Sequence, residues 1–248
     1  MLSYRESQIL NILKEKKYAK IEEIAKEIYV SEATVRRDVA KLKSLGLLER
    51  DHGGAIFVEN SEEVHIFVRK EQDPFEKLAT ANIAVPHLPD FTSVFIDNSS
   101  TLLVLAKLID FRHKTVVTNG MALAGELSKK EHVNIIVPAG NVNNNSNSIT
   151  GPLTARTLLD MNFDLYLGSC AAINENGTYE SSSEQAEIKR VVMNNSLKKI
   201  LLVDRTKFDK KATFRTARLD DYDAIFTNAG EEIIKKAVDK GAKIINHK

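Results

Sequence analysis

The chain has 248 residues, of which 43% are hydrophobic and 28% are charged, and its 35 basic and 34 acidic side chains give a formal net charge of +1. This length allows two domains with sizeable cores, and the composition is that of an ordinary globular protein. The near-neutral charge excludes a uniformly basic nucleic-acid-binding protein, and the single cysteine, Cys170, excludes an internal disulfide and a cysteine-based zinc cluster.

Two helices are predicted at the start of the chain. Ser3 and Glu6 have the spacing of a capping box, in which the side chain of each residue bonds the backbone N–H of the other. Apolar residues follow at helical spacing, so the first helix should cover residues 4–16. A second, shorter helix is expected over residues 21–28, where apolar residues again recur at helical spacing.

A third predicted helix, over residues 32–45, is basic and has clear end signals. Ser31 can cap its start and Gly46 can stop it. Its apolar positions predict a buried face made of Ala33, Val39, Leu42 and Leu45. Four of the remaining positions hold basic residues that are free to face outward, namely Arg36, Arg37, Lys41 and Lys43.

A small hairpin should follow, with residues 47–50 paired to residues 55–58 and Gly53-Gly54 at the turn. A capped basic helix, a glycine stop and a glycine-tipped hairpin are the parts with which a winged helix-turn-helix grips duplex DNA. The helix that enters the major groove meets base edges with its N-terminal residues, here Ser31, Glu32, Thr34, Val35 and Arg36. The complete set of predicted DNA contacts is Ser31, Thr34, Arg36, Arg37, Lys41, Arg50, His52 and Gly53.

Bulk charge does not decide between DNA binding and an ordinary solvated surface. Residues 1–58 hold 11 basic and 9 acidic side chains, a net charge of about +2 (11 − 9). Taken alone, Arg36-Arg37-Asp38 is more often a solvated helix face than a DNA contact. Arg36 and Arg37 point about 100° apart on a helix, so one is expected to reach a base edge while the other holds a phosphate. His52 has no second His or Cys at ligand spacing, so no metal is expected there.

Residues 59–74 are charged and poor in large apolar side chains, which predicts a linker between an N-terminal domain, 1–58, and a C-terminal domain, 75–248. In the second domain, short apolar runs rich in β-branched residues alternate with helical stretches, which predicts an α/β, Rossmann-like fold with a mostly parallel sheet covered on both faces. Strands are expected over 94–96, 116–117, 133–137, 163–167, 200–203, 224–226 and 243–245, and helices over 75–84, 101–109, 121–129, 184–196 and 231–239. The polar tract 141–148 is expected to be an exposed or ligand-covering loop rather than a packed element.

Polar residues follow several of these strands, where open α/β sheets bind their ligands. Ser99, Ser100 and Thr101 stand where a strand turns into a helix, a place that favours an anionic group such as phosphate, and Lys207 can add a compensating charge. The alternative is that the hydroxyls only cap a helix, that Asn119 only forms a turn and that Lys207 is a surface residue. The predicted effector-binding residues are Asp97, Asn98, Ser99, Ser100, Thr101, Thr118, Asn119, Gly140 and Lys207.

The N-terminal part closely resembles the signature of the DeoR family of bacterial transcriptional regulators, in VSEATVRRDV of residues 30–39 and RDHGGA of residues 50–55. Val39 stands where the family usually has Leu. The resemblance implies a winged helix-turn-helix followed by an effector domain similar in fold to ribose-5-phosphate isomerase. It also implies a repressor of a sugar or carbohydrate operon, with double-stranded operator DNA and a phosphorylated sugar as partners, acting as a homodimer or homotetramer.

The resemblance continues into the C-terminal domain. DNSST of residues 97–101 falls where the family has its phosphate loop, Thr118-Asn119 matches a Thr-Asn pair, and DRTKF of residues 204–208 matches an Asp-x-Ser/Thr-Lys-Phe element. A family helix is matched only approximately, at Glu184, Ala186, Lys189 and Arg190. The chain departs from the family at Ala139-Gly140, where Gly-Gly is usual, and at GSCA of residues 168–171, which bears on the identity of the effector.

The alternative function is a sugar-phosphate isomerase fused to a DNA-binding module. Asp97, Asp204 or Glu184 can supply the base that such chemistry needs, but the acidic cluster expected of the isomerases is not recovered from the sequence. We therefore expect a regulator without catalytic residues, cofactor or metal. The chain has no stretch of 18 uninterrupted apolar residues and no signal-peptide pattern, which predicts a cytoplasmic protein outside the membrane.

Overall fold

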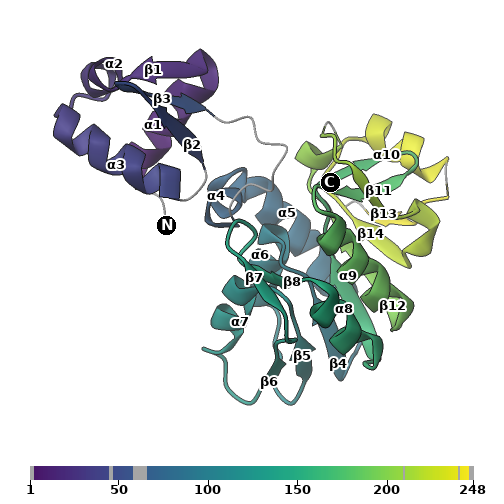
Figure 1. Cartoon of the computed structure of the whole chain (residues 1–248). Coiled ribbons are helices and arrows are strands. Elements are labelled where there is room, and N and C mark those ends of the chain that lie inside the picture. Colours follow the sequence, from purple (N-terminus) through teal and green to yellow (C-terminus); the bar gives the residue numbers. More distant parts are fainter. Residues whose placement is uncertain (1–2, 45–46, 58–65, 209, 240, 246–248) are drawn as a thin grey trace. The chain divides into compact units, whose positions relative to one another are not determined.

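The computed structural model describes residues 3–44, 47–57, 66–208, 210–239 and 241–245 (Figure 1). The chain divides into two compact units, residues 1–72 and 73–248. The division falls inside the predicted linker, and residues 66–71 of that segment form a helix, α4 (Ile66–Glu71). The predictions for Leu45, Gly46, Val58 and residues 59–65 lie outside the described residues.

The N-terminal unit contains the helices α1 (Tyr4–Lys16), α2 (Ile21–Glu27) and α3 (Glu32–Ser44). The capping box forms as predicted, since the Glu6 N–H lies 3.2 Å from the Ser3 hydroxyl and the Ser3 N–H lies 2.7 Å from the Glu6 carboxylate. On α3 one prediction was wrong, because Ala33 is exposed and Val35 is fully buried. Val35, Val39 and Leu42 form the buried stripe, so Val35 cannot be one of the residues that meet base edges.

A small antiparallel sheet completes this unit. Its strands are β1 (Tyr18–Lys20), β2 (Leu48–Asp51) and β3 (Gly54–Phe57), in the order β1-β3-β2. The predicted hairpin is therefore present, and β1 is an additional strand that pairs with β3 along its other edge. Because β1 has only one buried residue, Ala19, its sequence carries no strand periodicity.

The C-terminal unit is an α/β domain around a parallel sheet with the order β15-β14-β12-β9-β4-β5-β6 (Figure 1). The strands are β4 (Ser93–Ile96), β5 (Thr115–Val117), β6 (Asn134–Ile136), β9 (Phe163–Gly168), β12 (Ser196–Leu202), β14 (Ala224–Phe226) and β15 (Ile244–Ile245). The helices are α5 (Pro74–Ala84), α6 (Ser100–Leu108), α7 (Met121–Leu127), α8 (Pro152–Leu159), α9 (Ser183–Asn194) and α10 (Glu231–Val238), with 3-10 turns at Val85–His87, Arg205–Lys207 and Leu219–Asp221.

Helices cover both faces of this sheet, as the alternation of strands and helices predicts. Val94 and Ile96 of β4 point into one hydrophobic cluster, which α5, α6 and α7 complete. Phe95, between them, points into a second cluster on the other face, which α8, α9 and α10 complete. Successive side chains of a strand alternate between faces, so a strand buried on both sides reads as an apolar run.

The strand order reverses at β4. From β4 the chain adds β5 and β6 on one side, and then β9, β12, β14 and β15 on the other. The switch point therefore lies between β4 and β9. In open α/β sheets the ligand crevice lies outside the carboxyl ends of the strands at such a point.

Two antiparallel elements were not predicted. One is a sheet of β10 (Ala172–Asn174), β11 (Gly177–Glu180) and β13 (Phe214–Ala217). The other is a hairpin of β7 (Asn141–Asn143) and β8 (Ser148–Thr150). The interpretation of residues 141–148 as an unpacked loop was wrong, because Ser146 and Ser148 are fully buried. Short polar side chains bond within this turn, since the Ser146 and Ser148 hydroxyls lie 2.6 Å apart and the Asn143 side chain accepts the Asn145 and Ser146 N–H groups.

The carboxylate of Asp164 joins the amino ends of β9 and β4. One of its oxygens accepts the Thr92 N–H at 2.8 Å, the Thr92 hydroxyl at 2.7 Å and the Ser93 N–H at 2.9 Å. These hydrogen bonds, the Thr92 hydroxyl first, lower the pKa of Asp164 from 3.8 to about 2. The stability they contribute is present above pH 4 and is lost as the pH falls toward 2.

We expect Asp164→Asn to lower the free energy of unfolding at pH 7 by about 1–2 kcal/mol, because the carboxylate accepts these bonds better than an amide does. The variant should also lose part of the decline in stability between pH 4 and pH 2. Urea denaturation followed by circular dichroism measures both effects. Asp160→Asn, at an exposed residue without a side-chain hydrogen bond in the described structure, is the control. Equal losses in the two variants would contradict the assignment.

Candidate functional site

The predicted recognition helix α3 presents polar side chains to solvent at its N-terminus. The Ser31 hydroxyl lies 3.3 Å from the Thr34 N–H, which it caps, and 3.0 Å from the Thr34 hydroxyl. Arg36 is exposed and pairs with Glu32 one turn earlier, at 3.1 Å. Arg37 is also exposed and forms no ion pair within the described residues, so its guanidinium is available to a phosphate.

The opposite side of α3 is attached to α1 by two ion pairs. Asp38 is 4% exposed and accepts two hydrogen bonds from the Arg5 guanidinium. Lys41 lies 2.7 Å from Glu6, which is 3% exposed. Burial acts to raise the pKa of Glu6, but the hydrogen bonds from Lys41 and Ser3 outweigh it and lower the pKa. Lys41, a predicted DNA contact, therefore pairs with α1 while its side chain remains 53% exposed.

The β2–β3 hairpin, which is the wing of the predicted winged helix-turn-helix, depends on its two glycines, Gly53 and Gly54, for different reasons. Gly53 has φ +82°, a left-handed conformation that side chains rarely adopt. A Cβ on Gly54 would lie 2.6 Å from the ring of Tyr18, because β1 brings this tyrosine across the turn. Arg50, His52 and Gly53, all predicted DNA contacts, are exposed on this hairpin.

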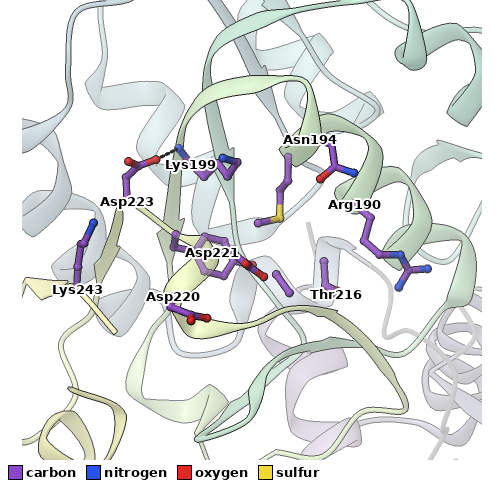
Figure 2. Close-up of a pocket in the computed structure, with 11 residues that line it drawn as sticks. Arg190, Asn194, Lys199, Thr216, Asp220, Asp221, Asp223 and Lys243 are labelled. Atoms are coloured by element: carbon purple, nitrogen blue, oxygen red, sulfur yellow. Dashed lines mark hydrogen bonds between the residues drawn. The ribbon is translucent and has the colours of Figure 1, made fainter. Parts of the chain in front are cut away.

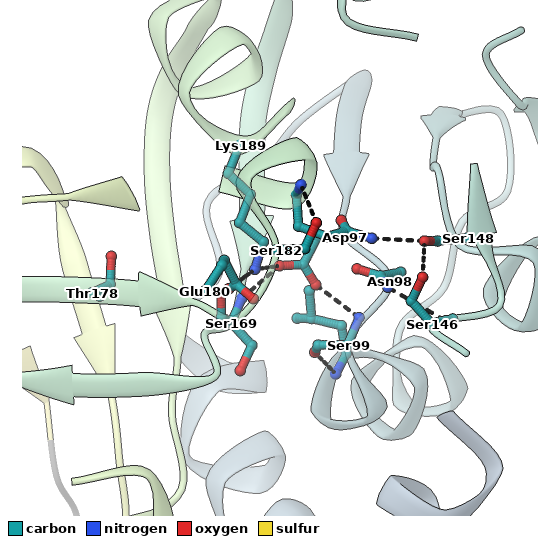
Figure 3. Close-up of polar contacts among 12 residues, drawn as sticks. Asp97, Asn98, Ser99, Ser146, Ser148, Ser169, Thr178, Glu180, Ser182 and Lys189 are labelled. Atoms are coloured by element: carbon teal, nitrogen blue, oxygen red, sulfur yellow. Dashed lines mark hydrogen bonds and ion pairs between the residues drawn. The ribbon is translucent and has the colours of Figure 1, made fainter. Parts of the chain in front are cut away.

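The predicted effector site lies at the switch point of the parallel sheet. The Asp97 carboxylate, 1% exposed, accepts the Ser99 N–H and the Ser169 N–H, each at 2.9 Å (Figure 3). Ser169 follows β9 and Asp97 follows β4, so one carboxylate connects the two strand ends across the switch. Both oxygens of Asp97 are engaged by the protein, and we conclude that this residue orders the loop.

Lys189 of α9 completes this connection. Its ammonium lies 2.8 Å from Asp97, 2.5 Å from Glu180 and 2.6 Å from the Ser169 carbonyl oxygen (Figure 3). Burial alone would lower the pKa of Lys189, but Asp97 and Glu180 raise it well above 10.5. The sequence interpretation missed Glu180 and matched Lys189 only approximately; two acidic residues and one lysine far apart in the chain give no spacing signal.

The start of α6 lies next to this cluster. The Ser99 hydroxyl caps the helix by accepting the Leu102 N–H at 3.0 Å, and Ser100 and Thr101 are buried in the first turn. The backbone N–H groups of Ser100 and Thr101 have no hydrogen-bond partner among the described residues. Such groups at a helix N-terminus attract an anion. Thr118 supports the neighbouring loop, because its hydroxyl accepts the Gly120 N–H at 3.0 Å.

The hairpin β7–β8 packs against the same strand ends. The Asn98 amide donates to the Ser146 carbonyl oxygen at 3.4 Å, and the Asn119 amide donates to Gln185 and to the Ile149 carbonyl oxygen, each at 3.3 Å. Gln185 in turn donates to the Ser148 hydroxyl at 2.7 Å. The structure therefore brings the loops of Asp97–Thr101 and Thr118–Asn119 together under one hairpin.

Two predicted effector residues, Gly140 and Lys207, lie beside the loops of Asp97–Thr101 and Thr118–Asn119 rather than in them. Gly140 is at the open end of the hairpin, where a Cβ would come within 1.9 Å of the Thr154 hydroxyl. Lys207 belongs to the turn after β12, which β9 separates from β4. Burial raises the pKa of the Cys170 thiol, and the positive charges of Lys189 and Lys207 act against that shift. The positive charge of Lys207 therefore acts on Cys170, which lies two residues after the end of β9.

A cavity of about 410 Å³ lies elsewhere, beside the amino ends of β14 and β15 (Figure 2). Arg190, Lys199, Thr216 and Asp221 are among its lining residues, and none of the predicted effector residues lines it. Its charged rim mixes both signs. Within the described part of the chain no group of three or more His, Cys, Asp or Glu side chains is arranged to hold a metal, and no helix is long and apolar enough to cross a membrane.

Comparison with known families agrees with this architecture. Residues 5–61 match the DeoR-like helix-turn-helix domain, and residues 72–229 match the DeoR C terminal sensor domain. The chain belongs to the DeoR family of transcriptional regulators. This DeoR-family chain is a regulator rather than an enzyme, since its relatives bear names of regulators.

Several characterised and uncharacterised members are similar over nearly the whole chain. The uncharacterized HTH-type transcriptional regulator YulB of Bacillus subtilis is 30% identical, over 98% of this chain and 96% of that protein. The L-fucose operon activator of Haemophilus influenzae is 32% identical, over 92% of each chain. The glycerol-3-phosphate regulon repressor of Escherichia coli is 28% identical, over 91% of this chain and 90% of that one. Among solved structures, ribose 5-phosphate isomerase A of Methanocaldococcus jannaschii is 15% identical, with a TM-score of 0.40 over 56% of each chain.

The two ion pairs behind α3 generate a stability prediction. Arg5→Met would leave the buried Asp38 carboxylate without its cation, so we expect the melting temperature of the N-terminal unit to fall by about 5 °C or more. Arg36→Met, which breaks an exposed pair on the same helix, should lower it by less than about 2 °C. Thermal unfolding followed by circular dichroism makes the comparison. A similar small change in both variants would show that the Arg5–Asp38 pair does not hold α3.

Proposed function

We propose that this regulator represses a sugar or carbohydrate operon in the cytoplasm, and that a phosphorylated sugar bound to its C-terminal domain changes its affinity for operator DNA. The sensing half of this proposal, effector binding by the C-terminal domain, rests on the start of α6. There the N–H groups of Ser100 and Thr101 have no partner among the described residues and lie at the switch point of the sheet. The names of the relatives support the regulatory half, since they include a regulon repressor and an operon activator.

For the DNA half, α3 enters the major groove and the wing lies beside it. Arg36 is held in place by Glu32, which suits a side chain that must meet a base edge in one orientation. Arg37 has no such restraint and takes a phosphate. The proposed contact residues are Ser31, Thr34, Arg36, Arg37, Arg50, His52 and Gly53.

For the sensing half, the phosphate of the sugar binds at the N-terminus of α6, with Lys207 as a counter-charge. The Asn119 Oδ1 and Asp204 Oδ2 atoms are buried and have no hydrogen-bond partner in the described structure. Buried acceptors without a donor are uncommon and costly. They follow β5 and β12, on either side of the Asp97 loop, and suit a ligand that offers several hydroxyl donors.

Coupling between the halves requires a homodimer or homotetramer, in which paired wings meet two half-sites separated by a whole number of helical turns. An effector can change operator affinity only if it binds one arrangement of the subunits better than another. The buried connection made by Asp97 ties the effector loop to both halves of the sheet, so that ligand binding there acts on a rigid body.

The DNA half is tested by fluorescence anisotropy with a labelled duplex from the region upstream of the chain's own gene. We expect Arg36→Ala to weaken binding about tenfold or more and to reduce the preference over a scrambled duplex. Arg37→Ala should weaken binding to both duplexes alike and reduce the dependence on salt. Lys43→Ala, at an exposed lysine on the same helix outside the proposed contacts, is the control. Wild-type binding by both arginine variants would exclude α3 as the reading helix.

The sensing half is tested by thermal shift with ribose 5-phosphate, fructose 6-phosphate, glucose 6-phosphate and glycerol 3-phosphate, against the unphosphorylated sugars. A binding sugar phosphate should raise the melting temperature and change operator affinity. Lys207→Met should reduce this response while leaving operator affinity without effector unchanged, and Lys211→Met, an exposed neighbour, should respond like the wild type. If Lys207→Met responds fully, that residue does not contact the effector; if no compound shifts the wild type, the proposed effector class is wrong.

A further inference from the structure

The turn between α2 and α3 contains a tyrosine in a backbone conformation that tyrosine disfavours. Tyr29 has φ +56°, in the left-handed region. The Val30 N–H bonds back to the Ala25 carbonyl oxygen at 3.0 Å, so the turn is a C-terminal helix cap of the kind in which glycine usually occupies this position. A bulky side chain in this conformation is strained, and the strain must be offset by another interaction.

Apart from that backbone hydrogen bond, no contact of the Tyr29 side chain within the described structure offsets it. The Tyr29 side chain is 94% exposed, which makes it the most exposed of the large hydrophobic side chains in the described part of the chain. Tyr18 provides the contrast, because its ring packs across Gly54 and stabilises the wing. The ring and hydroxyl of Tyr29 therefore contribute nothing to the packing of the domain that carries them.

The position of Tyr29 shows where a partner would be. The residue lies two positions before Ser31, which caps α3, and the Ser31 and Thr34 side chains at that end are the predicted groove contacts. When the N-terminus of a recognition helix enters the major groove, the turn ahead of it approaches the sugar-phosphate backbone along the groove's edge. Tyrosine hydroxyls are among the groups that bond phosphate oxygens in such complexes.

We infer that Tyr29 is a DNA contact of this regulator, whose hydroxyl donates a hydrogen bond to a backbone phosphate while its ring covers the adjoining sugar. The inference rests on the proposed placement of α3 in the major groove. A neutral donor binds phosphate without releasing a counterion, because it adds no positive charge. The contact therefore contributes affinity for every sequence and leaves the salt dependence of binding unchanged, which distinguishes it from Arg37.

The strain also predicts that stability and DNA binding change in opposite directions. Tyr29→Asn keeps a side chain that tolerates the left-handed conformation. We expect its melting temperature to equal or exceed that of the wild type by a few degrees, about 2–5 °C, while its affinity for DNA falls. Loss of binding in a variant that is no less stable cannot be attributed to misfolding.

The experiment measures anisotropy of the full chain on the upstream duplex and on a scrambled duplex, between 50 and 200 mM KCl, alongside melting temperatures. Tyr29→Phe should bind both duplexes about two- to tenfold more weakly, as expected for one lost neutral hydrogen bond, with an unchanged salt slope. Tyr29→Asn should bind more weakly still. Tyr4→Phe, at an exposed tyrosine of α1, is the matched control and should bind like the wild type.

Each outcome of these measurements either supports or overturns the DNA contact of Tyr29. Wild-type affinity of Tyr29→Phe overturns the hydroxyl contact, and wild-type affinity of Tyr29→Asn overturns any contact by this residue. A loss of binding that occurs only with a lower melting temperature in both variants makes Tyr29 a structural residue and also overturns the inference. Arg36→Ala and Arg37→Ala are measured in parallel, so that unchanged binding by both variants reports failure of the α3 placement rather than of Tyr29 alone.

Discussion

A single buried carboxylate, that of Asp97, connects the strand ends of the C-terminal domain at the switch point between β4 and β9. Asp97 accepts N–H groups from the loops after β4 and β9, which diverge from each other where the strand order reverses. An ionised carboxylate at 1% exposure is costly unless it is paired, and Lys189 supplies the pairing charge. The first two N–H groups of α6, those of Ser100 and Thr101, have no hydrogen-bond partner among the described residues, and we propose that they bind the ligand. The geometry of the proposed effector site follows from this arrangement.

Buried carboxylates are also paired with cations in the N-terminal unit. Glu6 and Asp38 are buried carboxylates, and each receives a cation from the facing helix. Together with the buried stripe of Val35, Val39 and Leu42, these pairs orient α3 and leave Arg36 and Arg37 exposed. The three consecutive charged residues Arg36-Arg37-Asp38 therefore lie in different environments. The two arginines face solvent, whereas Asp38 faces the interior of the unit. In both units a buried carboxylate is paired with a cation from a helix. Arg5 and Lys41 are themselves 40% and 53% exposed, whereas Lys189 is buried.

Much of the fold could be predicted from the sequence. The strands of the parallel sheet are buried on both faces, and their apolar runs, separated by helical periodicity, locate β4, β9 and β14 within a residue or two. The strands that were not predicted are short and antiparallel. β1 and β13 pair with strands distant in the chain, whereas β7 pairs with β8 in a local hairpin. For β1, β7 and β13 the pairing partner supplies the order that three or four residues cannot encode alone.

The sequence by itself determined the family, the two-part organisation, and the loops at which DNA and effector contacts should lie, because helix caps, glycine turns and hydrophobic periodicity are local properties. Only the tertiary structure decided which polar residues pair with other residues of the protein. Asp97 lies 92 positions from Lys189 (189 − 97), and Lys41 lies 35 positions from Glu6 (41 − 6). Burial and pairing are properties of the assembled fold, so no spacing along the chain shows that Asp97 and Lys189 are buried, or that the exposed Lys41 pairs with Glu6.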